Sequence, residues 1–256
     1  MEDKKKSPVG TILLVIIIIL LMGACLIGGY LIHEMQDKKD NKGDNVTTVD
    51  DNTKEPTQKV YDVTDETVSN LIEKYRVGLD CARLEVFTND KKVTANDISN
   101  DVAYEVAVFN KNDVFIKDTV TVEEATKEVQ KYFGKDYKFD PDSLKERKGT
   151  CISHYYDKAN KQFVHQETAC GGTCGPRTSY KLTKAVETDG VLELNTKVIF
   201  ASWDKATEGY YSDYQKTNKI ATFEEYNELI YDKGSTYKFT FKNEDGNYVF
   251  VSSEQV

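Results

Sequence analysis

The chain has 256 residues, of which 30% are charged and 39% hydrophobic, and its formal net charge at pH 7 is -9. This length allows one or two domains. The acidic balance argues against a nucleic-acid-binding protein, which needs a basic stripe to displace counterions from phosphates, and four prolines with 15 glycines exclude collagen-like and low-complexity chains.

The first predicted element is a transmembrane helix over residues 9–32, which follows a cytoplasmic tail of residues 1–8. No charged residue lies between Ser7 and Ile32, and most side chains there are Ile, Leu or Val. Thr11–Ile32 reaches roughly 33 Å as a helix, enough to cross a hydrocarbon core of roughly 30 Å. A secretory signal peptide has a shorter apolar region of about 7–15 residues, so the length favours an uncleaved signal-anchor over a cleaved signal peptide.

Cys25 leaves an alternative open within this segment. Leu21–Cys25 is similar to a bacterial lipobox, but the apolar run continues past Cys25, where a lipoprotein usually turns polar. Cys25 is therefore either lipidated or a thiol inside the membrane helix. Three lysines precede the run and three follow it closely, which nearly balances the positive-inside signal. The cysteines beyond the membrane decide the orientation, because disulfides form outside the cytoplasm, and we expect a single-pass protein of the cell membrane with its large domain extracytoplasmic.

Residues 33–60 are predicted to form a flexible stalk. They contain 12 charged residues among 28, no aromatic residue and only four apolar ones. Such a segment buries too little surface to offset the entropy lost on ordering. Asn45-Val46-Thr47 within it matches a glycosylation sequon. Residues 61–256 then form one extracytoplasmic domain of ordinary size.

The first half of this domain shows helical periodicity. Three helices are expected: one that begins at a Thr64 cap and buries Val68, Leu71, Ile72 and Tyr75, one over Thr94–Phe109, and one that begins at the capping box of Thr121 and Glu124 and stops at Gly134. A strand is expected over Ala82–Phe87, between the first two helices.

The second half changes to the two-residue period of strands. Three antiparallel pairs are expected: Cys151–Asp157 with Gln162–Thr168, Tyr180–Glu187 with Val191–Trp203, and two strands joined by Asp245-Gly246 that place Phe241 opposite Phe250. Between the last two pairs, Asp204–Asp232 is a polar excursion that contains Tyr210, Tyr211 and Tyr214, with a short helix from Thr222 and Glu225. These tyrosines serve either an interface or sugar contacts, or else they cover a sheet.

Helices followed by hairpins predict an α+β domain. We expect the N-terminal helices to pack on a curved antiparallel sheet, of the cystatin or NTF2-like kind by analogy, after one transmembrane helix.

Several residue groups together are familiar from one group of proteins. They are the lysine-led anchor, Lys91–Thr94, Tyr132–Lys135, Tyr156–Lys158, the run CGGTCGPR over Cys170–Arg177, Tyr237–Phe239 and Asn247–Phe250. On these residues the chain resembles uncharacterised single-pass, N-terminally anchored exported proteins of low-GC Gram-positive bacteria that carry a CGGTCGPR-type loop. The resemblance implies a bacterial surface protein and carries over no catalytic residue.

Four cysteines lie beyond the membrane segment, namely Cys81, Cys151, Cys170 and Cys174. An even number in an exported domain indicates two disulfides. The expected hairpin brings Cys151 near Cys170, which leaves Cys81 with Cys174; the pairing of Cys170 with Cys174 and of Cys81 with Cys151 stays open. Zinc binding or redox catalysis is the rival hypothesis, although three residues separate Cys170 from Cys174, rather than the two of a thioredoxin-like motif.

His154 and His165 are the strongest chemical indication in the sequence. The hairpin register that pairs positions summing to 319 places them opposite each other on one face. Two imidazoles at that distance are weak candidates for a metal site with a cysteine or carboxylate as third ligand. The alternative is two ordinary, half-exposed strand residues.

The loop around the last two cysteines is the other candidate site. Gly171, Gly172 and Gly175 permit tight or positive-φ backbone, and Arg177 is suited to an anion. The alternative is that the glycines only let the loop turn and that Arg177 is a solvated surface charge.

No catalytic signature accompanies these candidates: the sequence has no G-x-S-x-G, H-E-x-x-H or Walker A pattern. We therefore expect a non-enzymatic domain, without a cofactor, that binds or scaffolds an envelope protein or glycan. The alternative is a metal-dependent or other hydrolase built around His154 and His165. A signalling ectodomain is a third hypothesis, which needs a partner in the membrane because the cytoplasmic tail is so short.

Overall fold

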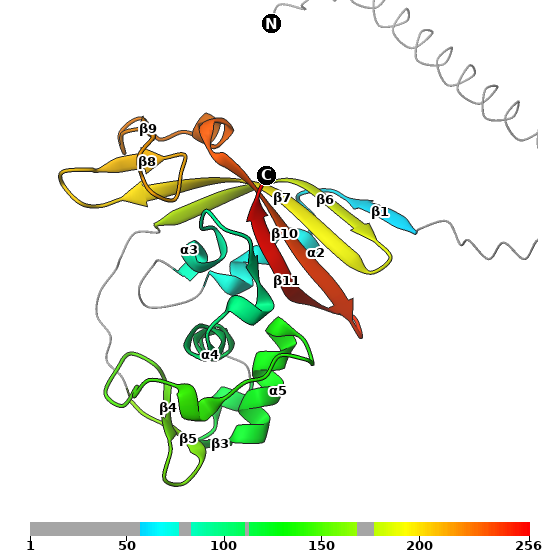
Figure 1. Ribbon diagram of the computed structural model, residues 1–256, viewed down its shortest axis with the longest axis vertical. Helices are drawn as coiled ribbons and strands as arrows, with labels where there is room; N and C mark the ends of the chain where they lie inside the picture. The colour runs from blue at the N-terminus through cyan, green and yellow to red at the C-terminus, as the bar shows by residue number, and fades with distance from the viewer. Residues whose placement is uncertain (1–56, 77–82, 111–112, 168–176) are drawn as a thin grey trace, which may run out of the picture. The chain divides into compact units, whose positions relative to one another are not determined.

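The computed structural model describes residues 57–76, 83–110, 113–167 and 177–256 (Figure 1). The chain divides into two units, Met1–Lys54 and Glu55–Val256, and all described residues belong to the second. The predicted tail, transmembrane helix and most of the stalk therefore lie outside the described residues. Within the described ranges no helix is both long and apolar enough to cross a membrane.

These ranges form an α+β structure with antiparallel sheets, as the periodicities predict. The α-helices are α2 (Glu66–Ser69), α3 (Arg83–Phe87), α4 (Asn100–Phe109) and α5 (Val122–Phe133). The 3₁₀ helices are η1 (Ile72–Tyr75), η2 (Ala95–Asp97), η3 (Asp113–Ile116), η4 (Pro141–Ser143) and η5 (Glu228–Lys233). The strands are β1 (Gln58–Tyr61), β2 (Val93–Thr94), β3 (Thr119–Thr121), β4 (His154–Asp157), β5 (Gln162–His165), β6 (Thr178–Thr188), β7 (Val191–Ser202), β8 (Gly209–Tyr211), β9 (Lys219–Ala221), β10 (Ser235–Glu244) and β11 (Asn247–Gln255).

The strands form a large and a small sheet. The large sheet has the order β1-β6-β7-β10-β11-β2, with β8 paired to β7 and β9 paired to β8, and the small sheet has the order β3-β5-β4. The tight turn after β10 uses two residues with positive φ, Asp245 at 55° and Gly246 at 87°. Phe241 pairs with Phe250, and His154 pairs with His165, so both predicted registers are confirmed.

Helix α5 confirms the predicted start and stop signals. The Thr121 hydroxyl accepts a hydrogen bond from the Glu124 N–H at 3.2 Å, and the Glu124 carboxylate accepts one from the Thr121 N–H at 2.9 Å. These bonds satisfy backbone donors that the first helical turn leaves without a partner. Gly134 follows with a φ of 89°, in the region that favours glycine.

The predicted Thr64 cap is wrong. Asp65 is the N-cap of α2, because its carboxylate accepts a hydrogen bond from the Thr67 N–H at 2.8 Å. The Thr64 hydroxyl instead donates to Asp62 at 2.6 Å, which leaves it engaged in the preceding turn. The helical stretch is also shorter than predicted, because the chain passes from α2 into the 3₁₀ helix η1.

Two further predictions in the first half are wrong. Arg83–Phe87 is helical rather than a strand, because a helix brings Leu84 and Phe87 onto the same face, where each is only 1% exposed. The expected helix over Thr94–Phe109 is interrupted at Ile98, whose ψ of 121° is extended. It therefore consists of η2 and α4, each with its own cap.

The excursion between β7 and β10 also differs from its prediction. Thr222 and Glu225 do form the expected local hydrogen bond, from the Thr222 N–H to the Glu225 carboxylate at 2.8 Å. However, this bond closes a turn, and the helical residues begin only at Glu228, after the Asn227 cap. The hairpin of β4 and β5 is likewise shorter than predicted at its open end, since β4 begins at His154.

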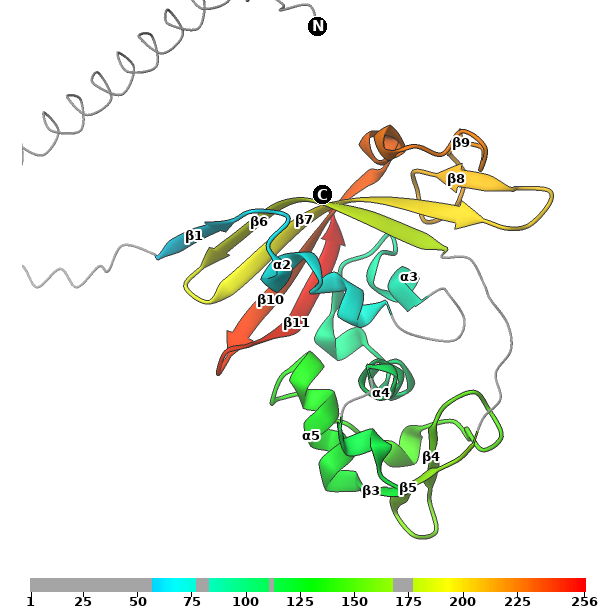
Figure 2. The same ribbon diagram turned by 180° about the vertical axis from the view of Figure 1, so that it is seen from behind.

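Side chains from the helical segments and from the large sheet share one core. The Tyr75 ring centroid lies 5.7 Å from that of Phe241 and 5.8 Å from that of Phe250. The Tyr75 hydroxyl donates to the Tyr132 carbonyl at 2.8 Å, so the one polar atom of this buried side chain is satisfied. Helices α2, α3 and α4 lie on one side of the large sheet in both ribbon views (Figures 1 and 2).

The other face of the large sheet is polar along β10. Lys238 alternates with the buried side chains of Tyr237 and Phe239, and its ammonium lies 3.4 Å from the Glu193 carboxylate and 3.2 Å from that of Glu254. A second, smaller core forms apart from this polar stretch. It joins Ile199 of β7 to Ile230 and Tyr231 of η5, with side chains of β8 and β9 packed against it.

Candidate functional site

The predicted histidine pair forms, but His154 is a buried structural residue. The two ring centroids are 5.1 Å apart. His154 Nε2 lies 2.7 Å from the carbonyl oxygen of Lys117, and Nδ1 lies 3.2 Å from the Ser153 hydroxyl. A carbonyl oxygen only accepts, so Nε2 carries the proton and donates it, which leaves Nδ1 as the acceptor for Ser153. Burial lowers the pKa of His154 and keeps the imidazole neutral.

This geometry does not make a metal centre. Both ring nitrogens of His154 are used in hydrogen bonds, so this side chain has no lone pair left for a cation. His165 is exposed at the surface. Over the described ranges, no three His, Cys, Asp or Glu side chains gather in a metal-binding arrangement.

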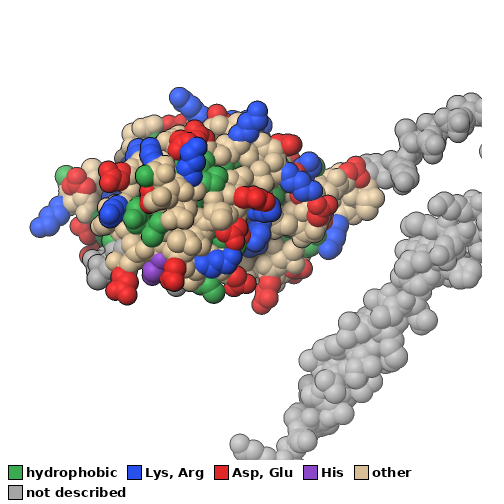
Figure 3. All heavy atoms as spheres, turned by 90° about the horizontal axis from the view of Figure 1, so that it is seen from below, with side chains coloured by type: hydrophobic (Ala, Val, Ile, Leu, Met, Phe, Trp, Pro, Cys, Tyr) green, Lys and Arg blue, Asp and Glu red, His purple; other side chains and the backbone are tan. Residues whose placement is uncertain are grey.

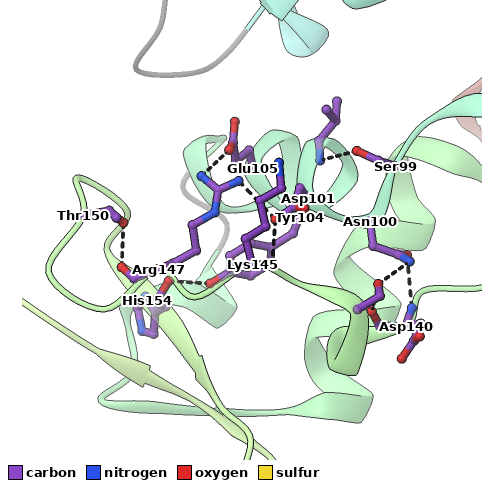
Figure 4. Close-up of polar contacts among 12 residues, drawn as sticks. Ser99, Asn100, Asp101, Tyr104, Glu105, Asp140, Lys145, Arg147, Thr150 and His154 are labelled. Atoms are coloured by element: carbon purple, nitrogen blue, oxygen red, sulfur yellow. Dashed lines mark hydrogen bonds and ion pairs between the residues drawn. The ribbon is translucent and has the colours of Figure 1, made fainter.

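Beside this hairpin, Arg147 forms a buried ion cluster (Figure 4). Its guanidinium lies 2.5 Å from the Glu105 carboxylate and 3.1 Å from the Asp101 carboxylate, and both acids project from α4. The Glu105 side chain is only 2% exposed. Burial lowers the pKa of Arg147, and the charges of Glu105 and Asp101 more than offset that effect. The guanidinium therefore stays charged and neutralises the carboxylates, which makes them poor candidates for a general base.

The same cluster fixes the connection that leads into the hairpin. The Lys145 N–H donates to Asp101 at 3.2 Å, and the Tyr104 hydroxyl donates to the His154 carbonyl oxygen at 2.6 Å (Figure 4). These bonds join α4 to the chain on both sides of Thr150, whose hydroxyl donates to the Arg147 carbonyl oxygen at 2.6 Å. These contacts indicate that the ion cluster of Arg147 positions the small sheet.

The predicted cysteine loop lies mostly outside the described residues, as do Cys81, Cys170, Cys174, Gly171, Gly172 and Gly175. Cys151 is disulfide-bonded. Arg177 is exposed immediately before β6, and its carbonyl oxygen accepts a hydrogen bond from the Ala201 N–H at 2.7 Å.

A cavity of about 420 Å³ adjoins Cys151 and is mainly apolar. Its lining residues are Val108, Phe109, Phe115, Ile116, Cys151, Ser153 and His165. Figure 3 shows acidic and basic side chains interspersed over the face of the molecule that it draws, so neither sign of charge forms a patch on that face. This cavity brings the exposed imidazole of His165 together with apolar side chains and with Ser153, whose hydroxyl lies 3.2 Å from Nδ1 of His154.

A different surface stands out by its exposed aromatic rings. We call Trp203, Tyr210, Phe223 and Tyr226 the aromatic cluster. The Trp203 and Phe223 ring centroids are 4.3 Å apart, those of Phe223 and Tyr210 are 5.1 Å apart, and those of Tyr210 and Tyr226 are 5.4 Å apart. Nevertheless Trp203 is 54% exposed and Tyr226 is 44% exposed. The rings thus support one another in a continuous row while two of them remain open to solvent.

Backbone constraints hold this row in place. Gly209 begins β8 with a φ of 137°, and a Cβ there would lie 2.6 Å from the Ala221 carbonyl oxygen on β9. Only glycine therefore allows β9 to approach β8 so closely beside Tyr210. Tyr210 also packs against the second core of Ile199, Ile230 and Tyr231. Burial and then the neighbouring Tyr226 raise the pKa of Tyr210, which keeps its phenol protonated.

Sequence reasoning found only part of this surface. The sequence pointed to three tyrosines in the excursion. Tyr210 belongs to the aromatic cluster. Tyr211 is buried, and the ring centroid of Tyr214 lies 6.1 Å from that of Phe200 in the main core. Trp203, Phe223 and Tyr226 were missed. The signal in the sequence that indicates them is the high density of aromatic residues, because seven occur from Trp203 to Tyr231. Only the pairing of β7, β8 and β9 shows which of the seven share a surface.

Comparison with known proteins adds no relative. No family model matches the chain, and no curated protein and no solved structure matches it. The described domain is thus defined by its own features, an antiparallel α+β structure with a supported row of open aromatic rings.

Proposed function

We propose that this chain is a membrane-anchored, extracytoplasmic domain that binds an envelope protein or glycan without catalysing a reaction. In this proposal residues 9–32 span the cell membrane once as a signal-anchor, residues 33–60 form the stalk, and residues 61–256 lie outside the cytoplasm. The proposal includes a curved sheet that the helices cover on one face, in the manner of cystatin or NTF2-like folds. The apolar run and the charged stalk support the location.

The exposed aromatic cluster is the observation that carries the binding role. An open tryptophan and an open tyrosine in one row of rings are costly to keep in water, and such side chains are enriched at the energetic centres of interfaces. Leu229, close in sequence to Tyr226, is 72% exposed and adds a further apolar side chain to the same excursion. Exposed apolar groups that lie together mark a contact surface more often than scattered ones do.

The buried polar groups support the non-enzymatic part of the proposal. His154 uses both ring nitrogens in the hairpin, and Arg147 neutralises Asp101 and Glu105. A hydrolase that used both His154 and His165 would need a free ring nitrogen on each imidazole, and His154 does not offer one. The geometry therefore favours the binding role over this alternative.

The test compares partner capture by the full chain and by a surface variant in native membranes. Chemical cross-linking is applied to cells that carry the wild-type chain, the double variant Trp203→Ser/Tyr226→Ser or the control variant Ile116→Ser. Ile116 is 78% exposed and lies on η3, away from the aromatic cluster in the sequence, so its replacement removes exposed apolar surface at a different place. We expect a cross-linked species that the double variant loses and the control retains. Equal cross-linking by all three chains would contradict the proposal.

A further inference from the structure

The stretch of chain that carries the aromatic cluster has an excess of exposed carboxylates. Between Trp203 and Lys233, six acidic residues are exposed, namely Asp204, Glu208, Glu224, Glu225, Glu228 and Asp232. Three lysines are exposed in the same stretch, namely Lys205, Lys219 and Lys233. Six acids against three lysines leave a surplus of three negative charges in the stretch of chain that carries the rings. This surplus repels an anionic polymer and attracts a cation.

The ring faces themselves also favour a cation. The face of an aromatic ring carries a negative quadrupole, and tryptophan gives the strongest attraction of the three aromatic residues. Within the described ranges the lysines that sit over rings are Lys59, 4.0 Å from the Tyr61 centroid, and Lys148, 5.6 Å from the Tyr155 centroid. The lysines of the excursion are thus not placed over the aromatic cluster. Trp203 and Phe223 cover each other on one side, and the indole, which is 54% exposed, keeps its open surface for a cation from another molecule.

Two exposed carboxylates lie next to the aromatic cluster in the sequence. Glu224 and Glu228 flank Tyr226 in the sequence, and both are exposed. Glu228 has a side chain that is 74% exposed, and its nearest lysine partner, Lys181, is 3.9 Å away, at the outer limit of an ion pair. Glu225, by contrast, accepts hydrogen bonds from Thr222 and closes the local turn. Glu224 and Glu228 therefore keep acceptor oxygens for an incoming ammonium or guanidinium group.

We propose that the aromatic cluster, with Glu224 and Glu228, binds a lysine- and arginine-bearing segment of a second polypeptide. This inference rests on the proposed binding function and names the chemistry of its partner. A neutral glycan also stacks on indole and phenol rings, but it makes no use of the surplus of carboxylates. A basic peptide satisfies both features, since its cations face the rings and carboxylates while its methylene groups cover exposed apolar side chains of the excursion such as Leu229.

The chain supplies its own probe for the test, because Trp203 is its only tryptophan. The full chain, held in a neutral detergent, is titrated with a ten-residue peptide of alternating lysine, arginine and glycine, with its glutamate-containing counterpart, and with a neutral N-acetylated tetrasaccharide. Emission of Trp203 and isothermal calorimetry report binding independently. We expect a saturable change with the basic peptide, and a Kd that rises at least about fivefold between 50 mM and 500 mM salt because the carboxylates are exposed to screening.

Three variants assign the binding to the proposed groups. Glu224→Gln/Glu228→Gln is expected to weaken binding of the basic peptide about threefold or more, and Trp203→Leu, followed by calorimetry, about tenfold. Glu123→Gln is the control for loss of an exposed carboxylate elsewhere, because that carboxylate is 77% exposed on α5, outside the excursion, and its loss leaves the Kd unchanged.

The outcomes separate this inference from the proposed function. Binding of the basic peptide that is equal in the wild type and in Glu224→Gln/Glu228→Gln overturns the inference. Binding of the tetrasaccharide but not of the basic peptide also overturns it and leaves the proposed binding function standing. Absence of any response, together with cross-linking that is unaffected by Trp203→Ser/Tyr226→Ser, overturns both.

Discussion

Removal of the Arg147 guanidinium is predicted to destabilise the domain strongly. Arg147 neutralises two carboxylates of α4, and one of them, Glu105, has a side chain only 2% exposed at 2.5 Å from the guanidinium. Breaking a buried ion pair from one side costs about 3–5 kcal/mol, because the remaining charge is left without compensation. The Arg147 side chain is 19% exposed, so water reaches part of the cluster, and we expect the lower end, about 3 kcal/mol for Arg147→Met.

This loss is large enough to measure by thermal unfolding. For a domain near 200 residues, about 3 kcal/mol lowers Tm by roughly 6–12 °C. The double variant Arg147→Met/Glu105→Met removes both charges and is expected to recover a large part of this loss, since an apolar pair of similar volume often replaces a buried ion pair without cost. Circular dichroism of the three chains at pH 7 gives the comparison.

The pH dependence provides a second check on the same reasoning. In Arg147→Met, burial favours the neutral form of the Glu105 carboxyl, so the folded state takes up a proton more readily than the unfolded state does. A group that binds protons more tightly in the folded state loses its stabilising effect as pH rises. The stability that Arg147→Met loses relative to the wild type is therefore larger at pH 7 than at pH 5. A Tm within about 2 °C of the wild type at both pH values would refute the role given to Arg147.

Three further outcomes follow from local geometry. Burial lowers the pKa of His154 and keeps its imidazole neutral, so the wild-type Tm is expected to fall as the pH drops below about 6.5, the pKa of a histidine in the unfolded chain. His154→Gln should flatten this dependence, and a pH profile parallel to that of the wild type would contradict the role given to His154. Thr121→Ala removes the cap of α5 and is expected to cost about 1 kcal/mol in urea unfolding, whereas Thr126→Ala, inside the same helix, is the control. Gly209→Ala places a Cβ 2.6 Å from the Ala221 carbonyl oxygen and should shift Trp203 emission while far-UV circular dichroism is retained; unchanged emission would show that β8 does not hold the aromatic cluster.

The sequence predicted the elements whose determinants are local. The capping box of Thr121 and Glu124 and the Asp245-Gly246 turn act over a few residues, so helix α5 and the pairing of Phe241 with Phe250 were both found. Helix α3 was mistaken for a strand because five residues contain too few apolar positions to separate the two periods.

The functional surfaces were harder to predict because they join distant residues. Glu105 and Arg147 are 42 positions apart, and nothing in either segment indicates that they meet. Trp203 and Phe223 come together only because β8 and β9 fold back along the end of β7. Burial of His154 likewise depends on the contact of its imidazole with the Lys117 carbonyl, 37 positions away, which no pattern along β4 reveals.

One measurement tests most directly whether the aromatic excursion is a contact surface outside the membrane. A photo-cross-linking amino acid is placed at position 229 or, as a control, at position 116; Leu229 is 72% exposed and Ile116 is 78% exposed, so both probes are open to solvent. Intact cells are irradiated, and the products are treated with a protease that does not enter them. The account predicts a cross-linked product from position 229 alone, and that product is digested by the external protease. Equal products from both positions, or a product that the protease cannot reach, would contradict it.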